Sequence, residues 1–153
     1  QWQIGATAIG QGNTVISPIH AAMLVSAIAN GGTLMKPYVI DSVQSTEGSV
    51  IEQYESENYG TLMSASESSQ LTKMMKAVVE EGTGYKLSGK NYSVAGKTGT
   101  AEVVGRGNNA WFVGFAPADD PKIAICVLVE DAGTASSEAV PIAGEILDAY
   151  LNN

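Results

Sequence analysis

Apolar side chains recur at helical spacing in the middle of the chain. They follow one another at intervals of three and four residues, which places them on one stripe of a helix. Ser64 and Glu67 stand just before this stripe and form a capping box, in which each side chain accepts a hydrogen bond from an otherwise unpaired backbone N–H. We therefore predict a helix that ends at residues 82–84, with the stripe Leu71, Met74, Met75, Val78 and Val79.

Two more helices are predicted from their starts. Ser17 followed by Pro18 is a typical helix beginning, and the residues from there to Ala29 are nearly all apolar or small. Asn30-Gly31-Gly32 should end this helix through a left-handed cap. The last helix should begin at Ser136 or Ser137 and run to about residue 151.

Three strand-like segments lie between these helices, at residues 93–101, 111–117 and 122–130. Short turns separate them, so they predict an antiparallel meander. Within residues 33–60, the stretch at residues 36–43 alternates well enough for one strand, and the turn Glu47-Gly48 leads to a second stretch at residues 50–54. These two stretches predict a peripheral hairpin. The expected fold class is therefore α/β (α+β layered), an antiparallel sheet with helices packed on it.

Composition narrows the possible functions. The chain has 153 residues, with 16 Asp and Glu against 8 Lys and Arg. This acidic balance argues against a nucleic-acid partner, because phosphate contacts need clustered basic side chains. No apolar run is long enough to span a membrane. The single cysteine excludes disulfides and cysteine-based metal sites, and we expect no metal and no cofactor.

The candidate chemistry lies in the first strand of the meander, which reads Ser93-Val94-Ala95-Gly96-Lys97-Thr98-Gly99-Thr100-Ala101. A lysine, two hydroxyls and two glycines on one short piece of backbone can present a cation, hydroxyl donors and N–H groups together. Such a set is suited to holding an anion. The glycines would let a ligand lie close to the backbone.

This strand and its surroundings resemble the transpeptidase domain of penicillin-binding proteins. The family combines Ser-x-x-Lys, Ser-x-Asn and Lys-Thr-Gly motifs, and residues 97–99 match the third. The segments 95–101 and 110–117 are similar to the class B, monofunctional branch. So are Ile9-Gly10-Gln11-Gly12, Ser17-Pro18 and residues 28–32. The formal Ser-x-Asn match at residues 56–58 lies in a charged loop and in the wrong order along the chain, so we reject it.

The resemblance implies roles for four residues. Lys97 and Thr100 would be catalytic: Lys97 would supply positive charge and join the proton network of the serine, and the Thr100 N–H would be half of the oxyanion hole. Thr98, Gly99 and Thr100 would bind the carboxylate of a D-Ala-D-Ala-type stem peptide or of a β-lactam. Strand alternation separates Lys97 from the two threonines, so we assume a twist or bulge at Gly99.

The nucleophile is missing from this sequence, because no lysine has a serine three positions earlier. We therefore expect residues 1–153 to be the C-terminal portion of one transpeptidase domain, a partial penicillin-binding and serine β-lactamase-like fold that lacks its N-terminal strands. Residues 33–60 would be a hairpin insertion. The parent would be a serine-type D,D-transpeptidase on the extracytoplasmic face of the bacterial cytoplasmic membrane, anchored by a segment not present in this chain.

The expected partners follow from the same hypothesis. They are the peptidoglycan stem peptide, β-lactams and the complementary N-terminal part of the domain. The strand at residues 122–130 would have an open edge, which favours a dimer or strand exchange.

Three alternatives remain at this point. One is another penicillin-recognising serine enzyme, namely a β-lactamase, a D,D-carboxypeptidase or a β-lactam sensor domain. The second is a non-catalytic module that binds a peptide carboxylate at residues 97–100. The third is a purely structural domain in which Lys97 is a solvated strand residue.

Overall fold

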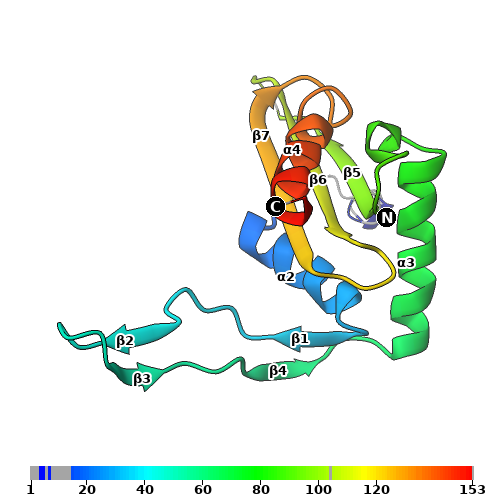
Figure 1. Cartoon of the computed structure of the whole chain (residues 1–153). Helices are drawn as coiled ribbons and strands as arrows, with labels where there is room; N and C mark the ends of the chain where they lie inside the picture. Colours follow the sequence, from blue (N-terminus) through cyan, green and yellow to red (C-terminus); the bar gives the residue numbers. More distant parts are fainter. Residues whose placement is uncertain (1–3, 6, 8–14, 104, 153) are drawn as a thin grey trace.

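An antiparallel sheet of three strands lies at the centre of the molecule (Figure 1). The computed structural model describes residues 4, 5, 7, 15–103 and 105–152. The strands β5 (Ala95–Ala101), β6 (Asn108–Ala116) and β7 (Ile123–Ala132) are ordered β5-β6-β7. The predicted meander and the layered fold class are confirmed. The segment Ile9 to Gly12, which contributes to the family resemblance, lies outside the described residues.

Helices cover both faces of this sheet (Figure 1). Helix α4 (Ala139–Leu151) packs on one face, and α2 (Pro18–Ala29) and α3 (Ala65–Glu80) pack on the other. The 3₁₀ turn η1 (Tyr85–Leu87) follows α3 and contributes Leu87 to the α4 side. The chain therefore passes round the outer edge of β5 between the two layers.

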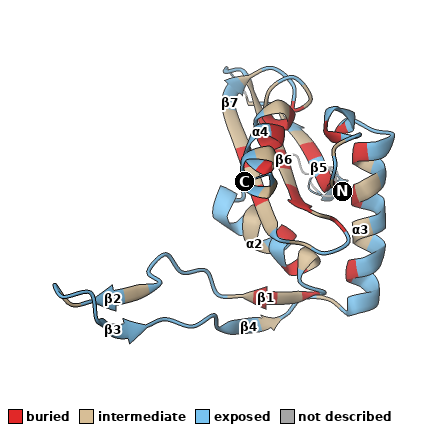
Figure 2. Ribbon diagram, in the orientation of Figure 1, coloured by how far each residue is buried: buried red, intermediate tan, exposed pale blue. Residues whose placement is uncertain are grey.

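Strand alternation divides the core into two clusters, one on each face of the sheet. Phe112 and Phe115 of β6 are fully buried but point to opposite faces, because three positions separate them. Phe112 packs with Val140 and Leu147 of α4. Phe115 packs with Val25 of α2 and with residues of α3 and β5. Figure 2 shows the buried residues gathered in the sheet and on the helix faces that cover it.

The starts of α2 and α3 are as predicted. The Ser17 hydroxyl accepts a hydrogen bond from the backbone N–H of His20. Ser64 and Glu67 form the expected capping box, and the Glu67 carboxylate accepts from the Ser64 N–H at 2.7 Å. The predicted start of the last helix is wrong, because α4 begins at Ala139 after Glu138. Ser137 instead accepts a hydrogen bond from the Thr134 N–H and closes a local turn.

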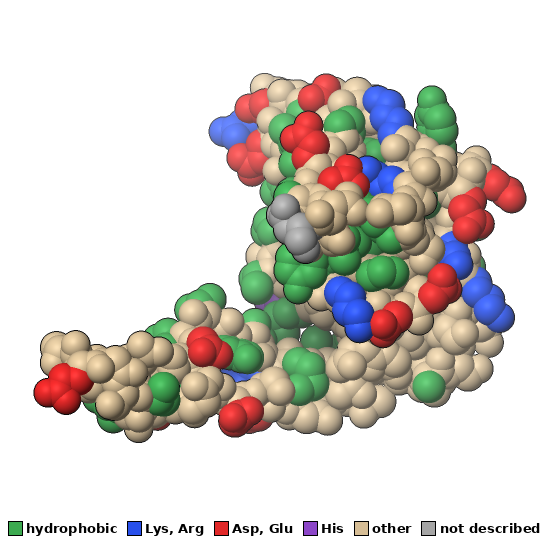
Figure 3. Space-filling model, in the orientation of Figure 1, with side chains coloured by type: hydrophobic (Ala, Val, Ile, Leu, Met, Phe, Trp, Pro, Cys, Tyr) green, Lys and Arg blue, Asp and Glu red, His purple; other side chains and the backbone are tan. Residues whose placement is uncertain are grey.

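Residues 33–61 form an extension that we call the arm (Figure 1). Strand β1 (Thr33–Met35) pairs with β4 (Asn58–Thr61), and β2 (Ser42–Gln44) pairs with β3 (Val50–Gln53). The sequence predicted one longer strand at residues 36–43, of which only the last two residues are in β2. The pairing of β1 with β4 was not foreseen. Figure 3 shows hydrophobic and acidic side chains exposed along the arm.

Candidate active-site strand and groove

Strand β5 holds all four candidate residues in regular pairing with β6. Lys97 lies opposite Val113, Thr98 opposite Phe112 and Thr100 opposite Ala110, without a shift of register from Ala95 to Ala101. The bulge assumed at Gly99 is therefore not present. Lys97 points to the face covered by α2 and α3, and the two threonines point to the α4 face.

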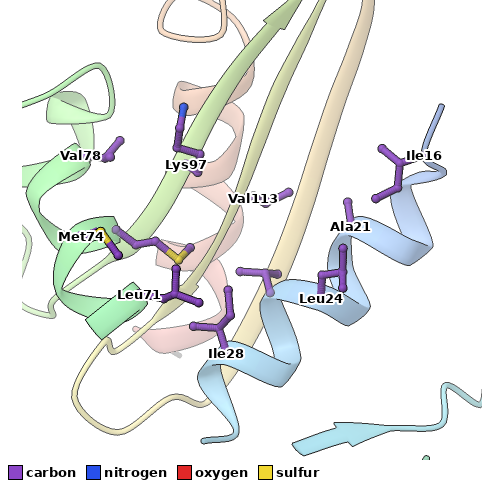
Figure 4. A pocket seen from close by; sticks show the side chains of 11 residues that line it. Ile16, Ala21, Leu24, Ile28, Leu71, Met74, Val78, Lys97 and Val113 are labelled. Atoms are coloured by element: carbon purple, nitrogen blue, oxygen red, sulfur yellow. The ribbon is translucent and has the colours of Figure 1, made fainter. Parts of the chain in front are cut away.

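Lys97 lies in an open groove of about 560 Å³ between α2 and α3. Its side chain is exposed, and Nζ donates a hydrogen bond to the carbonyl oxygen of Thr98 at 2.6 Å. Among the described residues that line the groove, Lys97 alone carries a charge. Figure 4 shows its side chain between the two helices, where the other lining residues are Ile16, Ala21, Leu24, Val25, Ile28, Leu71, Met74, Met75, Val78 and Val113.

The predicted apolar stripe of α3 is divided between the core and the groove. Met75 and Val79 are buried in the two core clusters, as the helical spacing predicts. Leu71, Met74 and Val78 line the groove instead, and the Met74 side chain is 59% exposed. The sheet thus covers only one side of the apolar stripe, and the other side faces the groove.

Thr98 is buried and has a partner outside the sheet. Its side chain is 7% exposed, and its Oγ1 lies 2.5 Å from Oγ1 of Thr83, in the loop between α3 and η1. The carbonyl oxygen of Thr83 in turn accepts a hydrogen bond from the Ser136 hydroxyl at 2.8 Å. This contact was not predicted, because the sequence around Thr83 is typical of a helix stop and Ser136 is typical of a helix cap.

Thr100 is exposed at the far end of β5. Its Oγ1 accepts a hydrogen bond from the backbone N–H of Ala135 at 3.2 Å. Ala135 is buried in the loop between β7 and α4, so this loop fixes the Thr100 hydroxyl. Both threonines of the candidate motif are therefore held by loops that sequence reasoning did not connect with the site.

The two glycines of β5 have different surroundings. A Cβ on Gly96 would lie 2.3 Å from Cζ of Phe112, so packing of that ring against the backbone requires glycine. A Cβ on Gly99 would meet only Cβ of Trp111 at 3.5 Å, an ordinary contact. A side chain would therefore fit at position 99, whereas the packing of Phe112 leaves no room for one at position 96.

Metal-binding clusters and membrane-spanning helices are both absent from the described residues. They contain no group of three or more His, Cys, Asp or Glu side chains arranged to hold a metal ion. Within the same ranges, no helix has the length and hydropathy needed to cross a membrane.

Comparison with known proteins identifies the family. Residues 1–148 match the family described as the penicillin binding protein transpeptidase domain. The chain therefore belongs to this family, as the Lys-Thr-Gly strand and its surroundings predicted.

Individual relatives agree with this assignment. The chain is 34% identical to the peptidoglycan D,D-transpeptidase PbpA of Mycolicibacterium smegmatis, with 97% of this chain and 32% of that protein covered. It is 38% identical to the stage V sporulation protein D of Bacillus subtilis, with 92% and 23% covered. The chain thus spans about a third or less of the length of these relatives.

A solved structure shows the same fold. The imipenem acyl-enzyme complex of penicillin-binding protein A from M. tuberculosis superimposes with a TM-score of 0.89 at 33% sequence identity. The match covers 96% of this chain and 33% of that one. The similarity therefore includes the sheet and the helices that flank it.

Proposed function

We propose that this chain is the C-terminal portion of a peptidoglycan D,D-transpeptidase domain that cross-links stem peptides through a serine acyl-enzyme. The observation that carries the proposal is the position of Lys97 in an apolar groove, where it is the one charged residue among the described lining residues. Lys97 lies on β5, an edge strand of the described sheet, which also bears Thr98, Gly99 and Thr100. Relatives named D,D-transpeptidase support it.

The proposed ligand lies along the outer edge of β5, which pairs only with β6 among the described strands. An extended peptide can add to such an edge through backbone hydrogen bonds. Side chains from both faces can reach a ligand there, so no bulge is needed. Thr98 and Thr100 would hold its carboxylate, Gly99 would leave room for it, and the Thr100 N–H would stabilise the oxyanion.

The nucleophilic serine and its lysine would come from the parent protein outside this chain. The groove beside Lys97 is apolar and open, so covering it with the complementary part of the domain would remove apolar surface from water. Strand β7 pairs only with β6 among the described residues, and its second edge could bind the same part or a second copy. Because peptidoglycan is the substrate, the parent would act on the extracytoplasmic face of the membrane through an anchor outside this chain.

The test is the intact mass of the chain and of its parent protein with excess penicillin. We expect no adduct on the chain alone and one penicillin on an upstream serine of the parent. Lys97→Ala should slow acylation of the parent by about 100-fold or more, because it removes both charge and proton transfer. Lys122→Ala is the matched control, since Lys122 is exposed and pairs with Asp120.

Other outcomes would contradict parts of the proposal. An adduct on a serine of the chain alone would show that the nucleophile lies within these residues. A parent that never reacts would favour a binding module, and an adduct that is rapidly hydrolysed would favour a β-lactamase-like relative. Sedimentation of the same samples measures whether the open edge of β7 binds a second copy of the chain. A chain that stays monomeric over a wide concentration range would exclude the dimer.

A further inference from the structure

Two loops from distant parts of the chain meet β5 on its α4 face. The loop after α3 brings the hydroxyl of Thr83 to the hydroxyl of Thr98, and the loop before α4 brings the N–H of Ala135 to the hydroxyl of Thr100. The hydrogen bond from Ser136 to the carbonyl of Thr83 joins the two loops. Both hydroxyls of the proposed carboxylate site are therefore oriented from outside the strand.

The contact of Thr98 with Thr83 has a defined chemical consequence. A threonine hydroxyl has one hydrogen to donate and two lone pairs to accept. If Thr98 donated to Thr83, its only hydrogen would be used within the protein. If Thr83 donates, Thr98 keeps its hydrogen for an anion, and accepting a hydrogen bond makes that hydrogen a stronger donor.

A buried hydroxyl depends on its partner for its orientation. Thr98 is 7% exposed, so neighbouring atoms leave its side chain little freedom. Thr83 is exposed, but Ser136 holds its backbone, which limits where its hydroxyl can point. Loss of the Thr83 hydroxyl would thus leave the Thr98 side chain in place but remove the contact that orients its hydroxyl hydrogen.

We propose that Thr83 is a positioning residue for the carboxylate site, donating to Thr98 so that the Thr98 hydroxyl is aimed at the carboxylate of the stem peptide or β-lactam. This role rests on the proposed transpeptidase function. Ser136 supports it by holding the carbonyl of Thr83. Thr83 itself touches neither the substrate nor the reacting atoms.

The experiment measures acylation of the parent protein by benzylpenicillin and by its methyl ester, which lacks the free carboxylate. Thr83→Val keeps the shape but removes the hydroxyl. It should slow acylation by the free acid about tenfold, the usual effect of losing one hydrogen bond to a charged group. Acylation by the ester should change less than about twofold, because no carboxylate is present to be held.

Three further variants separate positioning from folding. Thr83→Ser restores the hydroxyl and should return acylation to near the wild-type rate. Ser136→Ala should give a smaller loss for the free acid than Thr83→Val. Thr72→Val is the matched control, since the Thr72 hydroxyl donates to the carbonyl of Ser68 within α3 and not to a residue of β5. It should leave both rates unchanged.

Each outcome is decisive. Equal losses for acid and ester, or no loss for Thr83→Val, would overturn the positioning role while the proposed function stands. A wild-type parent that penicillin does not acylate would overturn the proposed function and this role with it.

Discussion

The sheet and the arm are both antiparallel β-structure, yet they differ in what surrounds them. The sheet has helices on both faces, and Phe112 and Phe115 are completely buried between the layers. The arm has two short ladders, each with a shift of register, and its large apolar side chains are mostly exposed. Examples are Val39 at 100% and Ile51 at 69% exposure. Apolar strand residues therefore become core only where another layer covers them.

The largest difference in stability is expected between variants of two aromatic residues, one from the sheet and one from the arm. Phe112→Ala should lower the free energy of unfolding of the chain by about 3–5 kcal/mol, because it leaves a cavity under α4. Tyr59→Ala in β4 should change it by less than about 0.5 kcal/mol, since Tyr59 is 67% exposed. Urea denaturation of both variants measures the difference. A large loss for Tyr59→Ala would show that the arm packs against something in solution.

A second pair of variants compares the two glycines of β5. Gly96→Ala should cost about 1–3 kcal/mol, because the new methyl group would overlap the ring of Phe112. Gly99→Ala should leave the midpoint of urea unfolding nearly unchanged, since its Cβ has room. In the parent protein we expect the opposite order of effects on acylation by penicillin, with Gly99→Ala as the variant that slows it more. Equal unfolding midpoints for the two variants would contradict the packing role of Gly96.

The smallest expected effect concerns ion pairs. In the sheet region, Asp148 of α4 binds Lys90 at 2.5 Å and the Tyr92 hydroxyl at 2.6 Å. Hydrogen bonds from Lys90 and then Tyr92 hold the pKa of the Asp148 carboxyl below its usual value. In the arm, Lys36 pairs with Glu57 at 2.9 Å, with both side chains more than half exposed. Exposed pairs of this kind contribute little to stability.

The lowered pKa of Asp148 makes the stability of the chain depend on pH. Above the pKa of about 4 that an unfolded aspartate has, Asp148 contributes fully to stability, and this contribution is lost as the pH falls through the lower folded value. The Tm difference between wild type and Asp148→Asn should therefore be present at pH 7 and shrink below about pH 4. Glu57→Gln should barely change Tm at pH 7. A Tm difference for Asp148→Asn that persists unchanged in acid would contradict the lowered pKa of Asp148.

Local signals in the sequence predicted local structure well. Ser17 with Pro18, and Ser64 with Glu67, identified helix starts because capping depends on neighbours within one turn. The start of α4 was wrong because a capping serine competes with other turns, and Ser137 bonds with Thr134 instead. The pairing of β1 with β4 was missed because these strands are too short to show alternation.

The candidate site was predictable only as far as local patterns in the sequence determine it. Strand alternation correctly placed Lys97 and the threonines on opposite faces of β5. The contacts of Thr98 with Thr83, and of Thr100 with Ala135, join residues 15 and 35 positions apart. Such contacts depend on how loops pack in three dimensions, and nothing in the pattern of either loop records them.

The apolar walls around Lys97 also affect how far its charge is felt. Water reduces the attraction between two unit charges 4 Å apart to about 1 kcal/mol, whereas near a protein surface the attraction is about 4 kcal/mol. Walls made of aliphatic side chains and methionine cannot reorient to oppose the field of the ammonium group as water does. Any surface that closes the groove would strengthen this field further. The hydrocarbon lining thus increases the pull of a single lysine on an anion without adding a second positive charge.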